Sequence, residues 1–118
     1  MKTYSFENLN AWQESRLLIK SVYEITMVFP EHEKFGLTSQ MRRAAVSIAS
    51  NIAEGSGRNS KLDKKHFYRM AYSSLLELLN QSLIAQDLNY ISVDILLSLR
   101  SKVDKTAYLI NQLSSSLK

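Results

Sequence analysis

Apolar residues recur along the chain with the spacing of amphipathic helices. The pattern is clearest between Phe35 and Arg58, where apolar side chains return every three or four residues. One face of this helix carries Leu37, Met41, Ala44, Ala45, Ile48 and Ile52. The opposite face carries Arg43, Ser47, Ser50 and Glu54. We predict a helix here that is capped by Thr38 and ends at Gly55 in the left-handed conformation.

Three further segments show the same periodicity. The first runs from Ala11 to Phe29 after an Asn10 cap, another from Lys61 to about Leu88 after Ser60, and the last follows Ser92. The first has its inner face at Ala11, Ser15, Leu18, Val22, Ile25 and Phe29, and the last at Leu96, Leu99, Val103, Ala107, Ile110 and Leu117. Short links join the segments. The sequence therefore predicts an all-α, antiparallel up-and-down four-helix bundle that forms a single domain over residues 1–118.

Two of the helices carry a second apolar row. On the helix around Ala45 this row is Val46, Ala49 and Ala53. For the helix that begins at Lys61 we place Phe67, Met70, Ala71, Ser74, Leu78, Ala85 and Leu88 in the core, and Tyr68, Tyr72, Leu75, Leu76, Leu79 and Leu83 on an outer stripe. A monomeric bundle cannot hide two stripes on one helix. We expect both second rows to form the interface of a homo-oligomer.

Positive charge is concentrated in one third of the chain. The net charge is +4, but the stretch from Phe35 to Tyr72 alone has an excess of five. Its basic residues are Arg42, Arg43, Arg58, Lys61, Lys64, Lys65 and Arg69. Such an excess favours an anionic partner such as RNA or DNA, and a solvated helix end accounts for the charge equally well.

Individual residues in this stretch also allow two interpretations. Arg42 and Arg43 could equally well contact phosphates or form ion pairs, within the bundle or between subunits, with partners such as Glu54 or Glu77. The rings of Tyr68 and Tyr72 lie among cations and could stack on bases of a single strand. Beside leucines at helical spacing, packing at an interface is the more common role of such rings.

Candidate chemistry is sparse. The chain has no cysteine, which excludes disulfides and thiolate chemistry and suits a reducing, cytoplasmic compartment. Asp63-x-x-His66 occurs once, whereas a di-iron bundle needs paired Glu-x-x-His motifs. The turn Gly55-Ser56-Gly57 could cradle an anion, but a helix cap explains it better. We expect no enzyme activity, no metal and no cofactor, and with no long apolar run we expect no membrane partner.

Several motifs together resemble a known family. They are Phe6-Glu7-Asn8-Leu9, Trp12-Gln13, Phe29-Pro30, the run from Phe35 to Ile48, Ser50-Asn51-Ile52-Ala53-Glu54-Gly55, and Ser73-Ser74-Leu75-Leu76-Glu77-Leu78. The chain resembles the small four-helix-bundle proteins encoded in intervening sequences of bacterial 23S ribosomal RNA genes. The resemblance implies a ring-like homo-oligomer, a pentamer, without known catalysis.

This family is in turn similar to the accessory protein of diversity-generating retroelements, a basic pentameric bundle that binds nucleic acid. Carried across by position, that similarity points to Arg42, Arg43 and Arg58, and less directly to the lysines and Arg69 that follow. The leading hypothesis is a non-enzymatic homo-oligomer that binds RNA or DNA through its basic surface. The alternative is a scaffold that binds another protein through the outer stripe.

Overall fold

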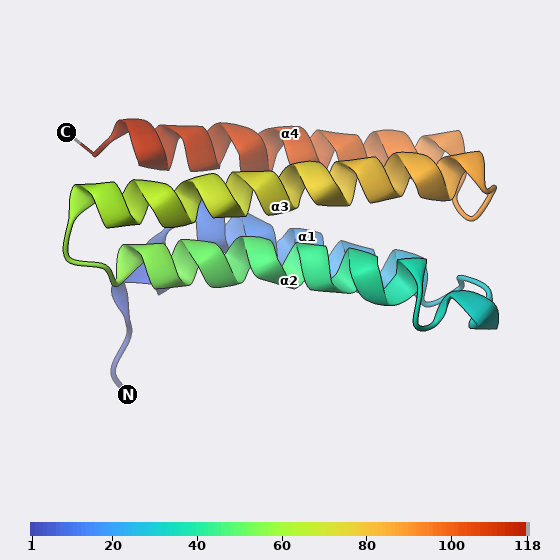
Figure 1. Ribbon diagram of the computed structural model, residues 1–118, viewed down its shortest axis with the longest axis horizontal. Coiled ribbons are helices and arrows are strands. Elements are labelled where there is room, and N and C mark those ends of the chain that lie inside the picture. The colour runs from blue at the N-terminus through green and yellow to red at the C-terminus, as the bar shows by residue number, and fades with distance from the viewer. Residues whose placement is uncertain (118) are drawn as a thin grey trace.

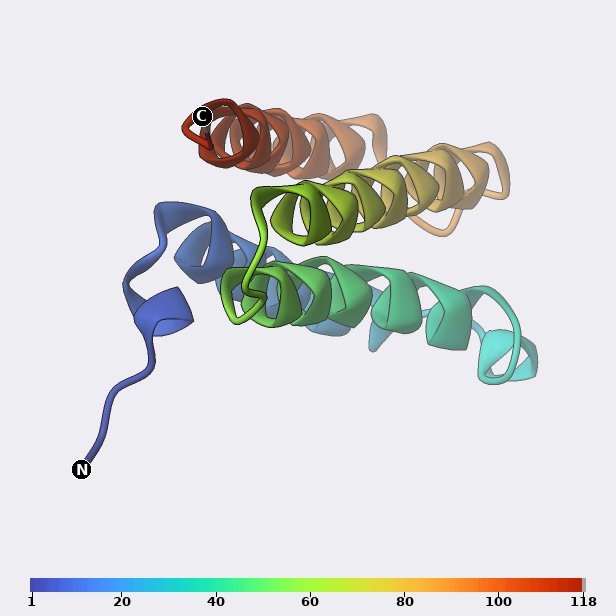
Figure 2. The same ribbon diagram turned by 60° about the vertical axis from the view of Figure 1, so that its left-hand side comes forward.

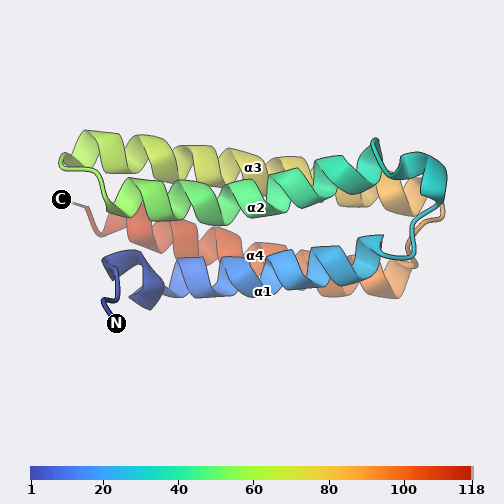
Figure 3. The same ribbon diagram turned by 90° about the horizontal axis from the view of Figure 1, so that it is seen from below.

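Four long helices make up the structure, a computed structural model that describes residues 1–117 (Figure 1). They are α1 (Asn10–Thr26), α2 (Leu37–Ser56), α3 (Lys61–Asp87) and α4 (Val93–Ser115), with short 3-10 turns η1 (Ser5–Asn8) and η2 (Glu31–Glu33). Consecutive helices run in opposite directions, and α4 returns to pack beside α1 (Figure 3). No strand occurs in residues 1–117, so the predicted all-α class is confirmed.

The bundle is long and narrow, at 44 × 28 × 21 Å. With a rise of 1.5 Å per residue, α3 alone is about 40 Å long and spans nearly the whole molecule. The N-terminal residues extend away from the bundle at the end where α2 connects to α3 (Figure 2). Within residues 1–117, none of these helices combines the length and the apolar character needed to cross a lipid bilayer.

The core runs along the bundle axis and receives side chains from all four helices. Its fully buried members are mostly aliphatic, and the largest are Leu18, Met41, Ile48, Ile52, Leu75, Leu78, Leu99 and Ile110. The predicted inner faces of α1, α2 and α4 are largely confirmed, although Leu37, Ile25 and Ala107 are only half-buried and Leu117 lies beyond the end of α4. Periodicity predicts these three faces well because each helix has one dominant apolar stripe.

The assignment of faces on α3 was partly wrong. Tyr68 and Leu75, which we placed on the outer stripe, are 3% and 0% exposed, whereas Met70 and Leu88 from the predicted core are 41% and 48% exposed. The buried row of α3 is Tyr68, Ala71, Leu75, Leu78, Ser82 and Ala85, together with Gln81 beside it. Because α3 has apolar residues on most of its circumference, its neighbours decide which row is buried.

Small side chains bring α2 and α3 close together. The Ser47 and Ser74 hydroxyl oxygens lie 2.9 Å apart across the interface, and Asn51 Nδ2 donates to the Ser47 carbonyl at 2.9 Å. Gly55 is buried at the end of this contact, and a Cβ there would lie 2.8 Å from Phe67 Cβ and 2.8 Å from Tyr68 Cε1. The predicted left-handed cap at Gly55 is wrong, since α2 continues to Ser56. This glycine is required for close approach.

The other helix ends also follow local chemistry. Ser60 and Ser92 accept hydrogen bonds from the third residues of α3 and α4, which confirms these two predicted caps. The predicted Asn10 cap is wrong, because Asn10 is already the first residue of α1 and Leu9 takes the cap position without a side-chain hydrogen bond. Thr38 does not cap α2, because the helix starts one residue earlier and Glu33 Oε1 accepts from the Leu37 N–H at 3.1 Å. Asn89, with φ of 62°, ends α3 in a Schellman arrangement, with the Tyr90 N–H donating to the Ala85 carbonyl.

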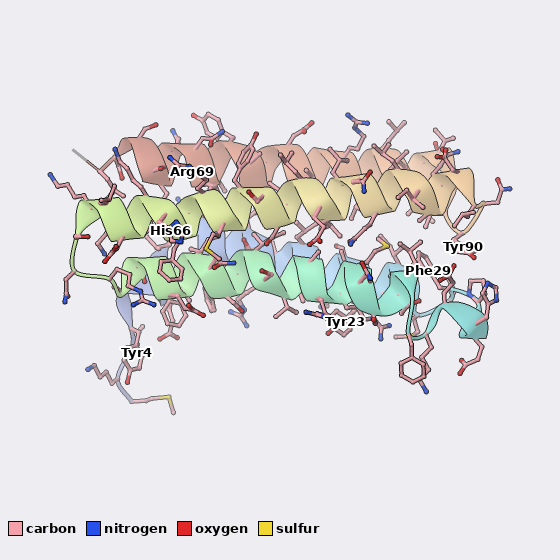
Figure 4. The ribbon with its side chains drawn as sticks, in the orientation of Figure 1. Tyr4, Tyr23, Phe29, His66, Arg69 and Tyr90 are labelled. Atoms are coloured by element: carbon pink, nitrogen blue, oxygen red, sulfur yellow. The ribbon has the colours of Figure 1, made fainter. Side chains whose placement is uncertain are left out.

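Glu33 links the α1–α2 connection to the α3–α4 connection, at the opposite end of the bundle from the N-terminus (Figure 1). Besides capping α2, its carboxylate accepts a hydrogen bond from Tyr90 Oη at 2.8 Å, and Tyr90 in turn packs against Phe29 (Figure 4). The Leu37 N–H, the Tyr90 hydroxyl and the nearby His32 hold the pKa of Glu33 below its ordinary value. The same bond raises the pKa of Tyr90.

Gly55→Ala should destabilise the protein despite the higher helix propensity of alanine. The added methyl group overlaps two side chains of α3, and overpacking of this kind typically lowers the free energy of unfolding by about 1–3 kcal/mol. The higher helix propensity of alanine offsets about 1 kcal/mol of this loss. Urea unfolding followed by circular dichroism measures the effect. Gly57→Ala is the matched control, because its Cβ would meet only the Glu54 carbonyl at 3.7 Å. Equal stability of the two variants would contradict the close approach at Gly55.

Glu33→Gln should lower stability at neutral pH and lose its effect in acid. Because the folded pKa of Glu33 is depressed, its carboxylate contributes stability above the pKa of the unfolded chain, near pH 4.3. That contribution disappears as the pH falls through the folded pKa. Urea midpoints from pH 7 to pH 3 should therefore converge for the wild type and the variant. Glu31→Gln, at an exposed neighbouring position, should leave a constant difference from the wild type, and divergence of Glu33→Gln in acid would refute the assignment.

Candidate nucleic-acid interface

Five of the predicted basic residues gather at one end of the bundle. Arg58 and Lys61 occupy the α2–α3 connection and the start of α3, and the first turns of α3 carry Lys64, Lys65 and Arg69. We call these five residues the basic end. All are exposed except Lys64, which is half-buried. Arg69 projects from α3 on the side away from Tyr4 and Tyr23 (Figure 4). Four of these cations lie on the first turns of α3, and Arg58 lies in the connection that precedes it.

Two members of the basic end have partners within the chain. Lys64 Nζ donates to the Ser56 carbonyl at 2.7 Å and so closes the last turn of α2. The Arg58 guanidinium lies over the Phe67 ring, 4.4 Å from its centroid. Lys61, Lys65 and Arg69 follow one another at four-residue intervals, which puts three exposed charges on one side of α3.

Arg42 and Arg43 lie elsewhere. Both are in the second turn of α2, roughly 20 Å along the helix from the basic end. Arg42 is half-buried against α1, where Nε donates to Thr26 Oγ1 at 2.9 Å and the guanidinium lies 4.6 Å from the Tyr23 ring centroid. Arg43 is exposed. The seven predicted residues therefore form two separate surfaces, because sequence proximity across a helix-turn-helix does not mean proximity in space.

The predicted ion pairs of these arginines with Glu54 or Glu77 are not formed. Across residues 1–117 a single ion pair is present, between Lys105 Nζ and Glu14 Oε2 at 3.4 Å. On the same polar face of α2, Ser47 forms side-chain hydrogen bonds with Ser74 and with Asn51. Ser50 and Glu54 are exposed. Within residues 1–117, the exposed side chain of Arg43 therefore has no carboxylate partner.

An open groove runs along α2 beside Arg42 and Arg43. Its volume is about 740 Å³, and it is bounded by the end of α1, the α1–α2 connection and the outer face of α2. Its lining residues are Tyr23, Lys34, Phe35, Thr38, Ser39, Arg42, Arg43, Val46, Ser47 and Ser50. We call it the α2 groove. Sequence reasoning missed Tyr23, Lys34 and Phe35, because their contribution depends on how the connection folds back over α2.

The predicted oligomer interface is only partly available at the surface. Ala49, Tyr68 and Leu75 are buried within the chain's own bundle, so their assignment to a subunit interface is wrong. Of the other predicted residues, Ala53, Tyr72, Leu79 and Leu83 are half-buried, and Val46 and Leu76 are exposed. Further large apolar residues that the sequence did not predict to be exposed are Leu17 on α1, Met27 and Val28 in the turn after α1, and Leu97 on α4.

Other candidate chemistry finds no support in the geometry. The turn after Gly55 does not form an anion cradle of left-handed residues, because the Ser56 hydroxyl donates to the Ala53 carbonyl and Gly57 has φ of −88°. Within residues 1–117, no three His, Cys, Asp or Glu side chains come close enough to share a metal ion.

The fold and these surfaces define a small helical-bundle protein with a cationic exterior. The sequence matches the model of the 23S rRNA-intervening sequence protein family over residues 7–112. The chain belongs to this family, which confirms the resemblance. A search of curated proteins gives no significant match.

A solved structure shares the fold. It is the crystal structure of a protein of unknown function from the S23 ribosomal protein family of Bacteroides thetaiotaomicron. The two superimpose with a TM-score of 0.78 at 18% sequence identity, over 88% of this chain and 97% of the other. At this identity, the similarity establishes a common architecture.

Proposed function

We propose that this protein binds RNA or DNA through the basic end, as a non-enzymatic homo-oligomer. The observation that carries the proposal is the group of exposed cations at the start of α3. The two acidic residues of this region, Glu54 and Asp63, form no ion pair with them, so the five positive charges outnumber the negative ones without being neutralised in pairs. Phosphates of a nucleic acid are the polyanion that such a surface attracts in a cell.

The arrangement of the cations supports backbone contacts in preference to base recognition. Lys61, Lys65 and Arg69 stand on one exposed stripe of a helix, where long side chains can each reach a phosphate. Contacts of this kind depend strongly on salt and little on sequence.

Self-association is the second part of the proposal. Leu76 is 50% exposed, and Leu97 on the neighbouring helix α4 is 58% exposed. Both are large apolar residues that a partner subunit could cover. The resemblance to pentameric bundles gives the expected number of subunits. A scaffold that binds a different protein through the same face is the alternative, because exposed apolar residues serve either role.

Replacing Lys61, Lys65 and Arg69 together by Gln should weaken RNA binding at least tenfold. Loss of three phosphate contacts should also reduce the slope of log affinity against log salt by about 2 for a single strand. Fluorescence anisotropy with a labelled 20-nucleotide RNA, repeated from 50 to 300 mM salt, measures both quantities. The control removes the same charge elsewhere, through Lys2→Gln, Arg100→Gln and Lys105→Gln. Salt-independent binding, or equal losses in the two triple variants, would refute the basic end as the binding site.

Light scattering on a size-exclusion column should give a native mass of about five times the 13.5 kDa chain. Leu76→Glu should reduce that mass, because a charge would be buried in the subunit contact. Leu62→Glu changes a residue that is 80% exposed near the start of α3 and should leave the mass unchanged. A monomeric wild type would contradict the assembly but leave the RNA measurement standing.

A further inference from the structure

The α2 groove combines free positive charge with exposed aromatic rings, and the basic end does not account for it. Its lining includes three cations, Lys34, Arg42 and Arg43, and no carboxylate. A smaller hollow on the other side of Arg43 is lined in part by Glu77, so it carries a negative charge that the α2 groove lacks. An anion is therefore favoured in the α2 groove and not in its neighbour.

Phe35 is the most unusual residue of this surface. Its ring is 88% exposed, although a phenylalanine ring gains about 2 kcal/mol or more from burial. Its backbone is held in place, since the next residues enter α2 through the Glu33 cap. Lys34 Nζ lies 5.6 Å from the centroid of the same ring. The chain thus presents a flat apolar surface and a positive charge together at the mouth of the groove.

Tyr23 and Arg42 form a second, more rigid pair. The Tyr23 ring is 41% exposed, with the Arg42 guanidinium stacked on it. Arg42 cannot swing away freely, because Thr26 Oγ1 and the Tyr23 carbonyl accept hydrogen bonds from it. A ligand would therefore meet a ring and a charge that are already ordered, which lowers the entropic cost of binding.

We infer that the α2 groove binds a single-stranded polynucleotide, with phosphates at Arg43 and Lys34 and a base stacked on Phe35. This inference rests on the proposed function and adds a second contact region to it. Stacking on exposed rings requires bases that are not already stacked in a duplex, so the groove selects single strands.

Phe35→Leu tests the stacking contact without removing charge or disturbing the core. Stacking of one base on an aromatic ring is worth enough to predict about fivefold or greater loss of affinity for a single strand. Anisotropy is measured with a labelled 15-nucleotide strand, made both as RNA and as DNA, and with a hairpin duplex of the same composition. Duplex affinity should not change. Tyr108→Leu, at a ring that is 61% exposed on α4, is the matched control and should bind like the wild type.

Arg43→Gln tests the phosphate contact. It should reduce the salt slope for the single strand by about 0.7, whereas Arg100→Gln on α4 should not. Suppose that Phe35→Leu binds the single strand as tightly as the wild type does, while the triple variant of the basic end still loses affinity. That result would refute the groove as a binding site and leave the proposed function intact. Absence of all nucleic-acid binding by the wild type would overturn both.

Two further results would assign the groove to another occupant. A lower native mass of Phe35→Leu in light scattering would show that a second copy of the chain covers the groove. The second result comes from competition with polyglutamate at the same concentration of negative charge as the single strand. If polyglutamate displaces the strand from the wild type but not from Phe35→Leu, the groove accepts an acidic peptide. Either result would overturn the inference.

Discussion

The close approach of α2 and α3 is the constraint on which most of this structure depends. Gly55 leaves the space that Phe67 and Tyr68 fill, and Ser47 meets Ser74 at hydrogen-bond distance near the middle of the contact. With Tyr68 turned into the core, the stripe that includes Lys61, Lys65 and Arg69 faces solvent. Burial also raises the pKa of the Tyr68 hydroxyl above its ordinary value. One missing side chain on α2 thereby sets the orientation of the charges on α3.

The cations of this protein lie against aromatic rings more often than against carboxylates. Arg16 stacks on Trp12 at 4.8 Å, Arg42 on Tyr23 and Arg58 on Phe67, whereas residues 1–117 contain one ion pair. A ring holds a guanidinium in position but leaves its net charge in place, unlike a carboxylate. The cations of the basic end therefore keep their net positive charge in the folded protein. This is the physical reason to look for a polyanion as a partner.

A four-helix bundle whose core is filled with side chains has no interior site, so its functions must be carried by its exterior. The two cationic surfaces differ in character. The basic end is a stripe of flexible side chains, suited to phosphates of any sequence, while the α2 groove is concave and carries rings. Along α2 they are offset by roughly 20 Å, and they open on different sides of the bundle, because Arg69 projects away from Tyr23, which lines the groove (Figure 4). In an assembly of several chains both surfaces would be repeated, which would increase the overall affinity.

The sequence by itself determined the number and type of the helices, although α1 ends at Thr26 and not at the predicted Phe29. Apolar periodicity and the serine caps at Ser60 and Ser92 are local signals, and they predicted α3 within one residue at each end. It also determined that five cations share one end, because they fall within twelve residues of chain. Only the tertiary structure decided which stripe of α3 is buried, since large side chains such as Tyr68 and Met70 occur on more than one side of the helix and Tyr68 is the one that packs against Gly55 of α2. It also decided that Arg42 and Arg43 form a groove with Tyr23 and Phe35, because that contact joins residues from three segments.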